Sequence, residues 1–243
     1  FVAASGLFQP DLLLVQRANL LTNHSPIRTM LFRVSRLPAR GPPTYNAPEA
    51  LYMSKQADSV NQARSLPSSL YTEEYFLTAC EGYDVFIESE GAHLSRRLRD
   101  AFALADVRPG MRLLDVGCGR GEILRHCMRL GVEAHGMDYA VAAARMSRDV
   151  VAAETARAAE TARAAETARP AEGEQPVPAP GVLQADAKTL PFPSNYFDRV
   201  LMFDVVEHLF PWELHQAYLE IARVLKPGGR LVIHTAPNRW YDA

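Results

Sequence analysis

The sequence predicts an α/β protein built around a doubly wound, mostly parallel sheet. Three observations support this prediction. From residue 92 onward, short apolar segments alternate with segments of helical periodicity. Turn residues bound each apolar segment, and a glycine-rich loop follows the first of them directly. With 243 residues, the chain is long enough to bury one substantial core of this kind.

The strands and helices can be placed in order along the chain. Residues 92–105 carry apolar side chains at helical spacing and predict a helix with one buried face. A second helix is predicted from Gly121 to Leu130, and a third covers 214–225 before KPGG ends it. The five predicted strands span residues 111–116, 132–138, 181–186, 197–204 and 229–236.

The connection between the second and third strands is unusually long. It contains the hexamer AAETAR three times in tandem, followed by a proline-rich stretch. Alanine makes the hexamer a strong helix former. Six residues advance an α-helix by about 600°, so the repeated charges spread around it and leave no apolar stripe. We interpret 152–181 as a low-complexity insertion that projects into solvent; a partner-binding arm is the alternative.

Residues 1–52 differ from the rest of the chain. Their only acidic residues are Asp11 and Glu49, and five arginines supply their charge. They show neither a sustained helical stripe nor strand alternation. An arginine-rich, acid-poor segment is typical of a targeting leader, but we favour a poorly structured leader ahead of one domain at 53–243.

The composition excludes several classes of protein. A net charge of −2, from 26 basic and 28 acidic residues, gives no electrostatic reason to expect nucleic acid or an anionic membrane as a partner. No apolar run is long enough to span a membrane. The three cysteines form no CxxC motif, which favours a reduced, cytoplasmic protein. The histidines show no metal-ligand spacing, so we expect no metal.

Acidic residues stand at the ends of four predicted strands. They are Asp115, Asp138, Asp186 and Asp204. Because the carboxyl ends of parallel strands meet at one edge of a sheet, where ligands bind, we expect these carboxylates around one site. Asp138 lies 21 residues after Gly117, close to the offset at which an acid binds ribose hydroxyls. The sequence therefore predicts an adenosine-like ribose at Asp138.

The glycine loop distinguishes between ligands. Residues 117–121 read G-C-G-R-G, one residue tighter than the dinucleotide fingerprint GxGxxG. Glu122 then places a negative charge where a pyrophosphate would meet the helix N-terminus. An amino acid joined to adenosine suits this loop better than a dinucleotide. An NAD-dependent oxidoreductase is the less favoured alternative. We interpret Cys118 as a small residue in a tight bend, and not as a nucleophile.

Five segments carry a resemblance to a known family: LLDVGCGRGE (113–122), GMDYA (136–140), QADAKTLPF (184–192), FDRVLMFDVVEHL (197–209) and LKPGGRLVIHTAPN (225–238). In this order they resemble the motifs of class I S-adenosylmethionine-dependent methyltransferases, especially the small-molecule, ubiquinone-pathway branch. The resemblance implies a Rossmann-like fold, S-adenosyl-L-methionine as cofactor, and methyl transfer to O, N or C of a small molecule. A cofactor-binding protein without catalysis is the alternative.

The resemblance also implies roles for individual residues. It places the methionine part of the cofactor at Asp115 and the glycine loop, the ribose at Asp138, and the adenine amino group at Asp186. Phe203 and Asp204 would face the methionine amino group and the acceptor. The full set of expected cofactor-binding residues is Asp115, Gly117, Cys118, Gly119, Gly121, Asp138, Tyr139, Asp186, Ala187, Phe203 and Asp204.

Two further expectations concern the acceptor side. His208, just past the fourth strand, is the candidate base for an acceptor that must lose a proton, and Glu207 is available to orient it. A histidine bonded to backbone at a helix start is the alternative. In the family the sheet continues after the fifth strand with an antiparallel hairpin. Since this chain stops at Ala243, we expect that hairpin to be missing and the edge strand exposed.

Overall fold

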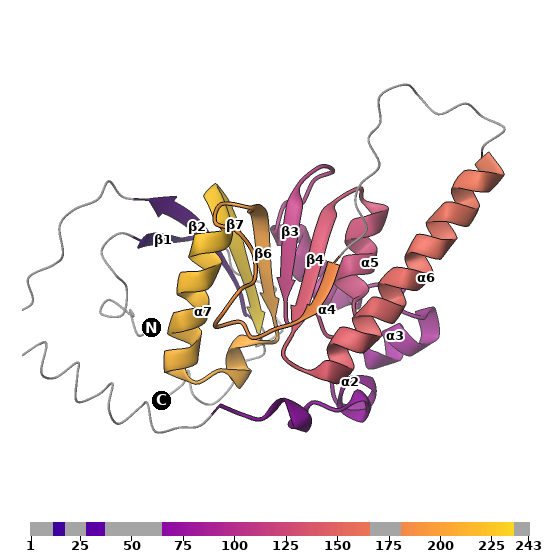
Figure 1. Ribbon diagram of the computed structural model, residues 1–243, viewed down its shortest axis with the longest axis horizontal. Coiled ribbons are helices and arrows are strands. Elements are labelled where there is room, and N and C mark those ends of the chain that lie inside the picture. The colour runs from indigo at the N-terminus through magenta and orange to yellow at the C-terminus, as the bar shows by residue number, and fades with distance from the viewer. Residues whose placement is uncertain (1–11, 18–27, 37–64, 166–180, 236–243) are drawn as a thin grey trace, which may run out of the picture.

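The computed structural model describes residues 12–17, 28–36, 65–165 and 181–235, and all structural statements below refer to these (Figure 1). They contain one sheet of seven strands in the order β1-β2-β7-β6-β3-β4-β5. Strands β3 to β7 run parallel to one another, which confirms the predicted doubly wound sheet. They are β3 (Arg112–Val116), β4 (Glu133–Asp138), β5 (Gly181–Gln184), β6 (Phe197–Phe203) and β7 (Leu225–Thr235).

Helices cover both faces of the sheet. Helices α4 (Arg96–Leu104), α5 (Glu122–Arg129) and α6 (Val141–Ala165) pack on one face, where Leu113 and Leu201 point. Helix α7 (Pro211–Val224) packs on the other, against side chains such as Leu114 and Met202. Successive strand residues point to opposite faces, so a strand buried on both sides must be apolar at nearly every position. This explains the continuous apolar segments of the sequence.

The edge of the sheet beyond β7 differs from the expectation. Within residues 1–52, which we expected to be poorly structured, Leu12–Arg17 forms β1 and Arg28–Arg36 forms β2. Strand β2 pairs antiparallel with β7, and β1 pairs antiparallel with β2. An antiparallel pair therefore covers this edge after all, but it comes from the N-terminal part of the chain. The backbone N–H and C=O groups of β7 therefore pair with β2, and no local pattern in the sequence predicts this pairing.

Leu31 and Phe32 connect β2 to the two sides of the core. Leu31 is opposite Val232 in the register and packs with it on the α4–α5–α6 face. Phe32 is opposite Leu231 and packs on the α7 face. Both side chains are partly buried. The β2 segment therefore contributes apolar contacts as well as backbone hydrogen bonds.

Strand β7 begins earlier than predicted. The structure assigns it from Leu225, so KPGG (226–229) ends α7 but lies within the strand, where the pairing with β6 is irregular. The glycines and proline disturb the ladder without preventing it.

Helix α6 contains the beginning of the repeat segment. It runs through the first two AAETAR hexamers, as their alanine content predicts. Its far end extends away from the sheet (Figure 1). Glu154, in the first hexamer, is nevertheless buried: its carboxylate accepts from Arg125 Nε and Arg129 Nη2, each at 2.9 Å. Ion pairs to α5, which the periodicity of apolar residues cannot reveal, thus hold the first hexamer against α5.

Candidate functional site

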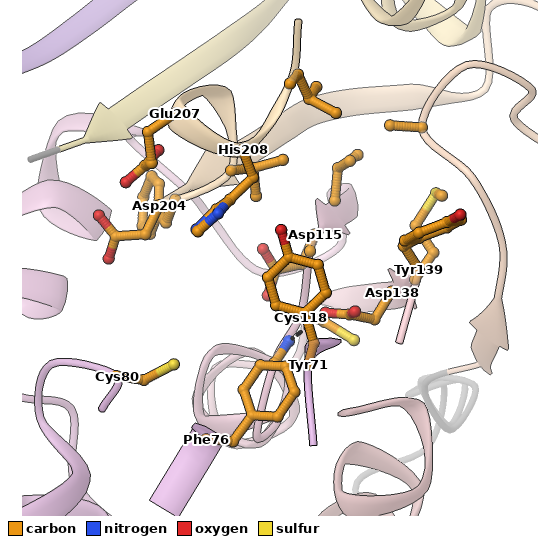
Figure 2. A pocket seen from close by; sticks show the side chains of 18 of the residues that line it. Tyr71, Phe76, Cys80, Asp115, Cys118, Asp138, Tyr139, Asp204, Glu207 and His208 are labelled. Atoms are coloured by element: carbon orange, nitrogen blue, oxygen red, sulfur yellow. Dashed lines mark hydrogen bonds between the residues drawn. The ribbon is translucent and has the colours of Figure 1, made fainter. Parts of the chain in front are cut away.

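The carboxyl ends of β3, β4 and β6 surround a cavity of about 550 Å³. This volume lies in the range of small-molecule sites. The strand-end residues Asp115, Asp138, Asp186 and Asp204 all line it, as the sequence predicts. Figure 2 shows Asp204, Glu207 and His208 on one side of the cavity, with Asp138 and Tyr139 on the other.

The glycine loop is packed so tightly that side chains would not fit at two positions. A Cβ on Gly117 would lie 2.3 Å from Val205 Cγ2, and one on Gly121 would lie 2.9 Å from the Ser147 backbone. Both glycines have positive φ, which other residues rarely adopt. The amides of Gly117 and Cys118 donate to the Met137 carbonyl at 2.8 and 3.0 Å. The loop is thus fixed between β3 and β4, and it forms one wall of the cavity.

Asp138 is oriented by backbone donors. Its Oδ2 accepts from Gly119 N at 3.0 Å, and its Oδ1 accepts from Ala140 N at 2.8 Å. Burial raises the pKa of this carboxyl, and the two backbone hydrogen bonds partly offset the effect. Each oxygen keeps further capacity to accept a hydrogen bond. A diol such as the expected ribose would find both acceptors already in position.

Asp115 lies at the end of β3 and is 2% exposed. Burial, followed by the negative charges of Glu122 and Asp138, raises its pKa to about 8. At neutral pH this carboxyl therefore holds a proton, and a cationic group placed beside it would favour its ionised form.

Cys118 fills the bend of the loop, as interpreted from its position. Its Sγ lies 3.3 Å from Ser147 Oγ, and burial raises the pKa of the thiol well above its usual value. A thiol held in its neutral form is a weak nucleophile.

Asp186 is held by its neighbour Lys188. Its Oδ1 accepts from the backbone N–H of Lys188, and Lys188 Nζ lies 2.9 Å from Asp186 Oδ2. The same ammonium donates to Glu213 Oε1 of α7 at 2.8 Å. Ala187 lines the cavity between the two charged residues. The sequence pattern predicts Asp186 but not Lys188, whose contacts depend on Glu213 of α7 lying beside it.

Asp204 has a partner that the sequence pattern does not predict. Arg97 of α4 donates from both terminal nitrogens to the two carboxylate oxygens of Asp204, with Nη1 and Oδ1 2.8 Å apart. Phe203, the preceding residue, also lines the cavity. Arg97 follows the N-cap Ser95 in an ordinary amphipathic helix, and nothing in the local sequence distinguishes it from a surface arginine.

Glu207 and His208 lie in the short 3₁₀ turn η2 (Val206–His208) after β6. The His208 ring meets Tyr71 edge-on, with centroids 5.4 Å apart, and burial lowers the pKa of the imidazole. Burial raises the pKa of Glu207, and its Oε2 is buried without a hydrogen-bond partner among the described residues. Within that part of the chain no hydrogen bond joins the two side chains. Both residues line the cavity, but the structure does not show Glu207 orienting His208.

A cap formed by residues 68–89, which precede β3, lines one side of the cavity. It comprises η1 (Ser68–Leu70), α2 (Glu73–Thr78) and α3 (Tyr83–Ser89), and Tyr71, Tyr75 and Phe76 line the cavity from it. Arg120 of the glycine loop donates to the carbonyls of Phe76 and Glu81, each at 2.9 Å. This arginine thus links the loop to the cap.

No group of three or more His, Cys, Asp or Glu side chains among the described residues is arranged to hold a metal ion. None of the described helices combines the length and apolar character needed to cross a membrane.

The sequence is similar to those of known proteins. Residues 114–233 match the family described as a methyltransferase domain. The chain is 32% identical over 167 residues to the ubiquinone/menaquinone biosynthesis C-methyltransferase UbiE of Bordetella parapertussis, an alignment that covers 66% of this chain and 54% of that one. It is 26% identical over 186 residues to the sterol 24-C-methyltransferase ERG6B of Gibberella zeae, covering 72% and 43%.

Among solved structures, the chain is similar to the PH0226 protein from Pyrococcus horikoshii OT3. The two are 25% identical, with a TM-score of 0.46, over 70% of this chain and 59% of that one. The chain spans about half the length of the curated relatives named above.

Proposed function

Because residues 114–233 carry a class I S-adenosylmethionine-dependent methyltransferase domain, we propose that this chain transfers a methyl group from S-adenosyl-L-methionine to a small-molecule acceptor. The main support for this proposal is that Asp138 and the glycine loop lie side by side at the same cavity. Asp138 offers two oriented acceptors, and the loop beside it is held in a conformation that leaves no room for side chains at Gly117 and Gly121.

The residues present suit this cofactor. We assign the ribose hydroxyls to Asp138, with Tyr139 beside it, and the adenine amino group to Asp186. We assign the methionine part to the glycine loop, Asp115 and Asp204. Glu122 at the start of α5 would oppose a pyrophosphate, but a ligand without phosphate meets no such penalty. Carboxylates predominate around the cavity, which suits a ligand that carries a sulfonium and an ammonium.

The protein has a limited chemical task. When bound, the cofactor supplies a methyl group already activated by its sulfonium. The chain must place the acceptor in line with that group and keep water out. The cap residues Tyr71, Tyr75 and Phe76 enclose the cavity and serve this purpose.

We assign His208 as the base for acceptors that must lose a proton. It is largely buried and its lowered pKa keeps the imidazole neutral near pH 7, so it can accept a proton. The ring faces the cavity beside Tyr71 (Figure 2). We also assign Glu207 to the acceptor side of the site. It precedes His208 in the chain, but no hydrogen bond joins the two side chains among the described residues.

The names of two relatives bear on the acceptor atom. One is a C-methyltransferase of ubiquinone/menaquinone biosynthesis and the other a sterol 24-C-methyltransferase. They favour carbon among the three acceptor atoms, oxygen, nitrogen and carbon. Our proposal also includes a cytoplasmic location and no nucleic-acid partner. The free thiols of Cys80, Cys118 and Cys127 support the cytoplasmic location. The net charge of −2 supports the absence of a nucleic-acid partner.

Calorimetry tests the cofactor assignment. We expect S-adenosylhomocysteine, the demethylated product, to bind to the purified chain and NADH to give no heat of binding. Binding of NADH alone would replace our proposal with an oxidoreductase. Transfer of a tritiated methyl group from S-adenosylmethionine to an acceptor separates an enzyme from a cofactor-binding protein without catalysis.

A further inference from the structure

Lys188 is one of three cationic side chains that line the cavity, with Arg97 and Arg120. All three are paired with carboxylates: Arg97 pairs with Asp204, and Arg120 pairs with Glu122. Lys188 differs from the other two in its partner. It is the cation that contacts the carboxylate assigned to the adenine amino group.

That carboxylate, Asp186, begins a tight turn that orients one of its two oxygens. The backbone N–H of Thr189 donates to the Asp186 carbonyl, and the backbone N–H of Lys188 donates to Oδ1, each at 2.9 Å. The turn does not hold Oδ2, and the side chain is 34% exposed. Lys188 Nζ lies 2.9 Å from this second oxygen. Each oxygen thus has one donor and keeps capacity to accept another hydrogen bond.

Lys188 is itself held in place by the first turn of α7. Its Nζ donates to Glu213 Oε1 at 2.8 Å and lies over the Trp212 ring, 5.5 Å from the ring centroid. A lysine on the surface samples many rotamers. Here the contacts with Glu213, Trp212 and Asp186 fix the ammonium at one point.

Glu213 is well suited to anchor this lysine. Its side chain is 3% exposed, and it accepts from the Phe210 backbone N–H at 3.0 Å and from Ser65 Oγ at 2.5 Å. Burial would raise the pKa of its carboxyl, but hydrogen bonds from Lys188, Ser65 and Phe210 lower the pKa below its usual value. Glu213 is therefore ionised at neutral pH, and a cation must stay beside it.

We propose that Lys188 is a positioning residue for the adenine base: its ammonium holds the Asp186 carboxylate in the orientation that accepts a hydrogen bond from the adenine amino group. The inference rests on the proposed function and deepens it, because it makes the choice of base depend on Lys188. A carboxylate already fixed at both oxygens loses less conformational entropy when it accepts from the amino group. It also repels the oxygen that replaces this group in a 6-oxopurine.

A purely structural role for Lys188 leads to a different expectation. In that case the lysine only neutralises the buried charge of Glu213 and supports the start of α7. Its loss would then lower stability and weaken every ligand of the site by the same factor. A positioning role changes the choice between two bases as well.

Two ligands that differ at carbon 6 of the base test the proposal: S-adenosylhomocysteine and S-inosylhomocysteine, in which an oxygen replaces the amino group. Calorimetry measures both affinities. We expect the unmodified chain to bind the adenosyl compound at least about tenfold more tightly, which corresponds to one hydrogen bond to a charged group. In Lys188→Met we expect this preference to fall to about threefold or less, because the carboxylate is no longer fixed.

Two further variants keep the test decisive. Lys188→Met combined with Glu213→Gln removes both charges of the pair, so it leaves no unpaired buried charge if the single variant fails to fold. We expect the same loss of preference in it. Lys226→Met is the matched control, since Lys226 lies 2.8 Å from Asp198 of β6 but does not line the cavity. We expect this control to keep the preference of the unmodified chain.

The possible outcomes separate this inference from the proposed function. If S-adenosylhomocysteine does not bind to the unmodified chain, the proposed function fails and the inference fails with it. If it binds, the inference alone is overturned by an equal affinity for the two compounds, or by a preference that the Lys188 variants leave unchanged. A loss of preference in Lys226→Met as large as that in Lys188→Met would overturn it too.

Discussion

Arg97 and Asp204 lie 107 residues apart in the sequence and form a two-point ion pair at the edge of the cavity. Arg97 lies near the start of α4, and Asp204 follows β6 with a positive φ of 55°. The Arg97 side chain is 12% exposed and that of Asp204 33%. Because Glu81 of the cap also lies against Arg97, this pair connects helix, sheet and cap at one point.

We expect Arg97→Met to destabilise the fold by about 2 kcal/mol, because it leaves the Asp204 carboxylate without its charged donor in a partly buried place. Urea unfolding measures this change. The adjacent Arg96→Met is the control, since Arg96 forms an exposed pair with Asp100 and should change stability by less than about 0.5 kcal/mol. Equal effects of the two variants would show that the pair with Asp204 contributes nothing specific.

We expect Asp138→Ala to weaken binding of S-adenosylhomocysteine by about 30-fold or more, corresponding to the loss of hydrogen bonds to a charged group. Calorimetry provides the affinity. Asp149→Ala, on the exposed part of α6, should bind as the unmodified chain does. An unchanged affinity in the Asp138 variant would contradict the ribose assignment.

The raised pKa of Asp115, about 8, predicts a pH-dependent stability. Between the ordinary pKa of an aspartate and this value, the folded protein holds a proton that the unfolded chain has lost. Stability contributed at this site is therefore present at low pH and falls as pH rises towards 8, by up to about 1.4 kcal/mol per pH unit. Urea unfolding from pH 5 to 8 should show this fall in the unmodified chain. It should be reduced in Asp115→Asn, and parallel curves would refute the prediction.

Truncation of Phe32 tests whether the N-terminal strands belong to the sheet. The side chain is partly buried against the α7 face, so we expect Phe32→Ala to cost about 2 kcal/mol. Thermal unfolding would record a lower midpoint. Ile87→Ala, at an exposed apolar position of α3, should leave the midpoint almost unchanged. If Phe32→Ala behaves in the same way, β2 does not pack on the core.

Much of the site could be predicted from local patterns. Strands β3 and β6 are mainly buried on both faces and stand out as apolar segments, and parallel strands bring their carboxyl ends to one edge of the sheet. Asp115, Asp138, Asp186 and Asp204 therefore meet at one cavity as expected. The residues that hold them could not be found in this way. Nothing in the local sequence distinguishes Lys188 and Arg97 from surface cations. Only the tertiary structure places Glu213 of α7 beside Lys188 and Asp204 beside Arg97.

The sequence by itself determined the parallel sheet, the glycine loop and the identity of the acidic edge, because these depend on hydrophobic periodicity and on backbone conformations that only glycine adopts readily. Tertiary structure alone decided which edge β2 covers, how Glu154 anchors the repeat helix, and that the three cations of the cavity are already paired. Each of these depends on side chains or backbone groups far apart in the chain, whose pairing leaves no periodic signal in either partner.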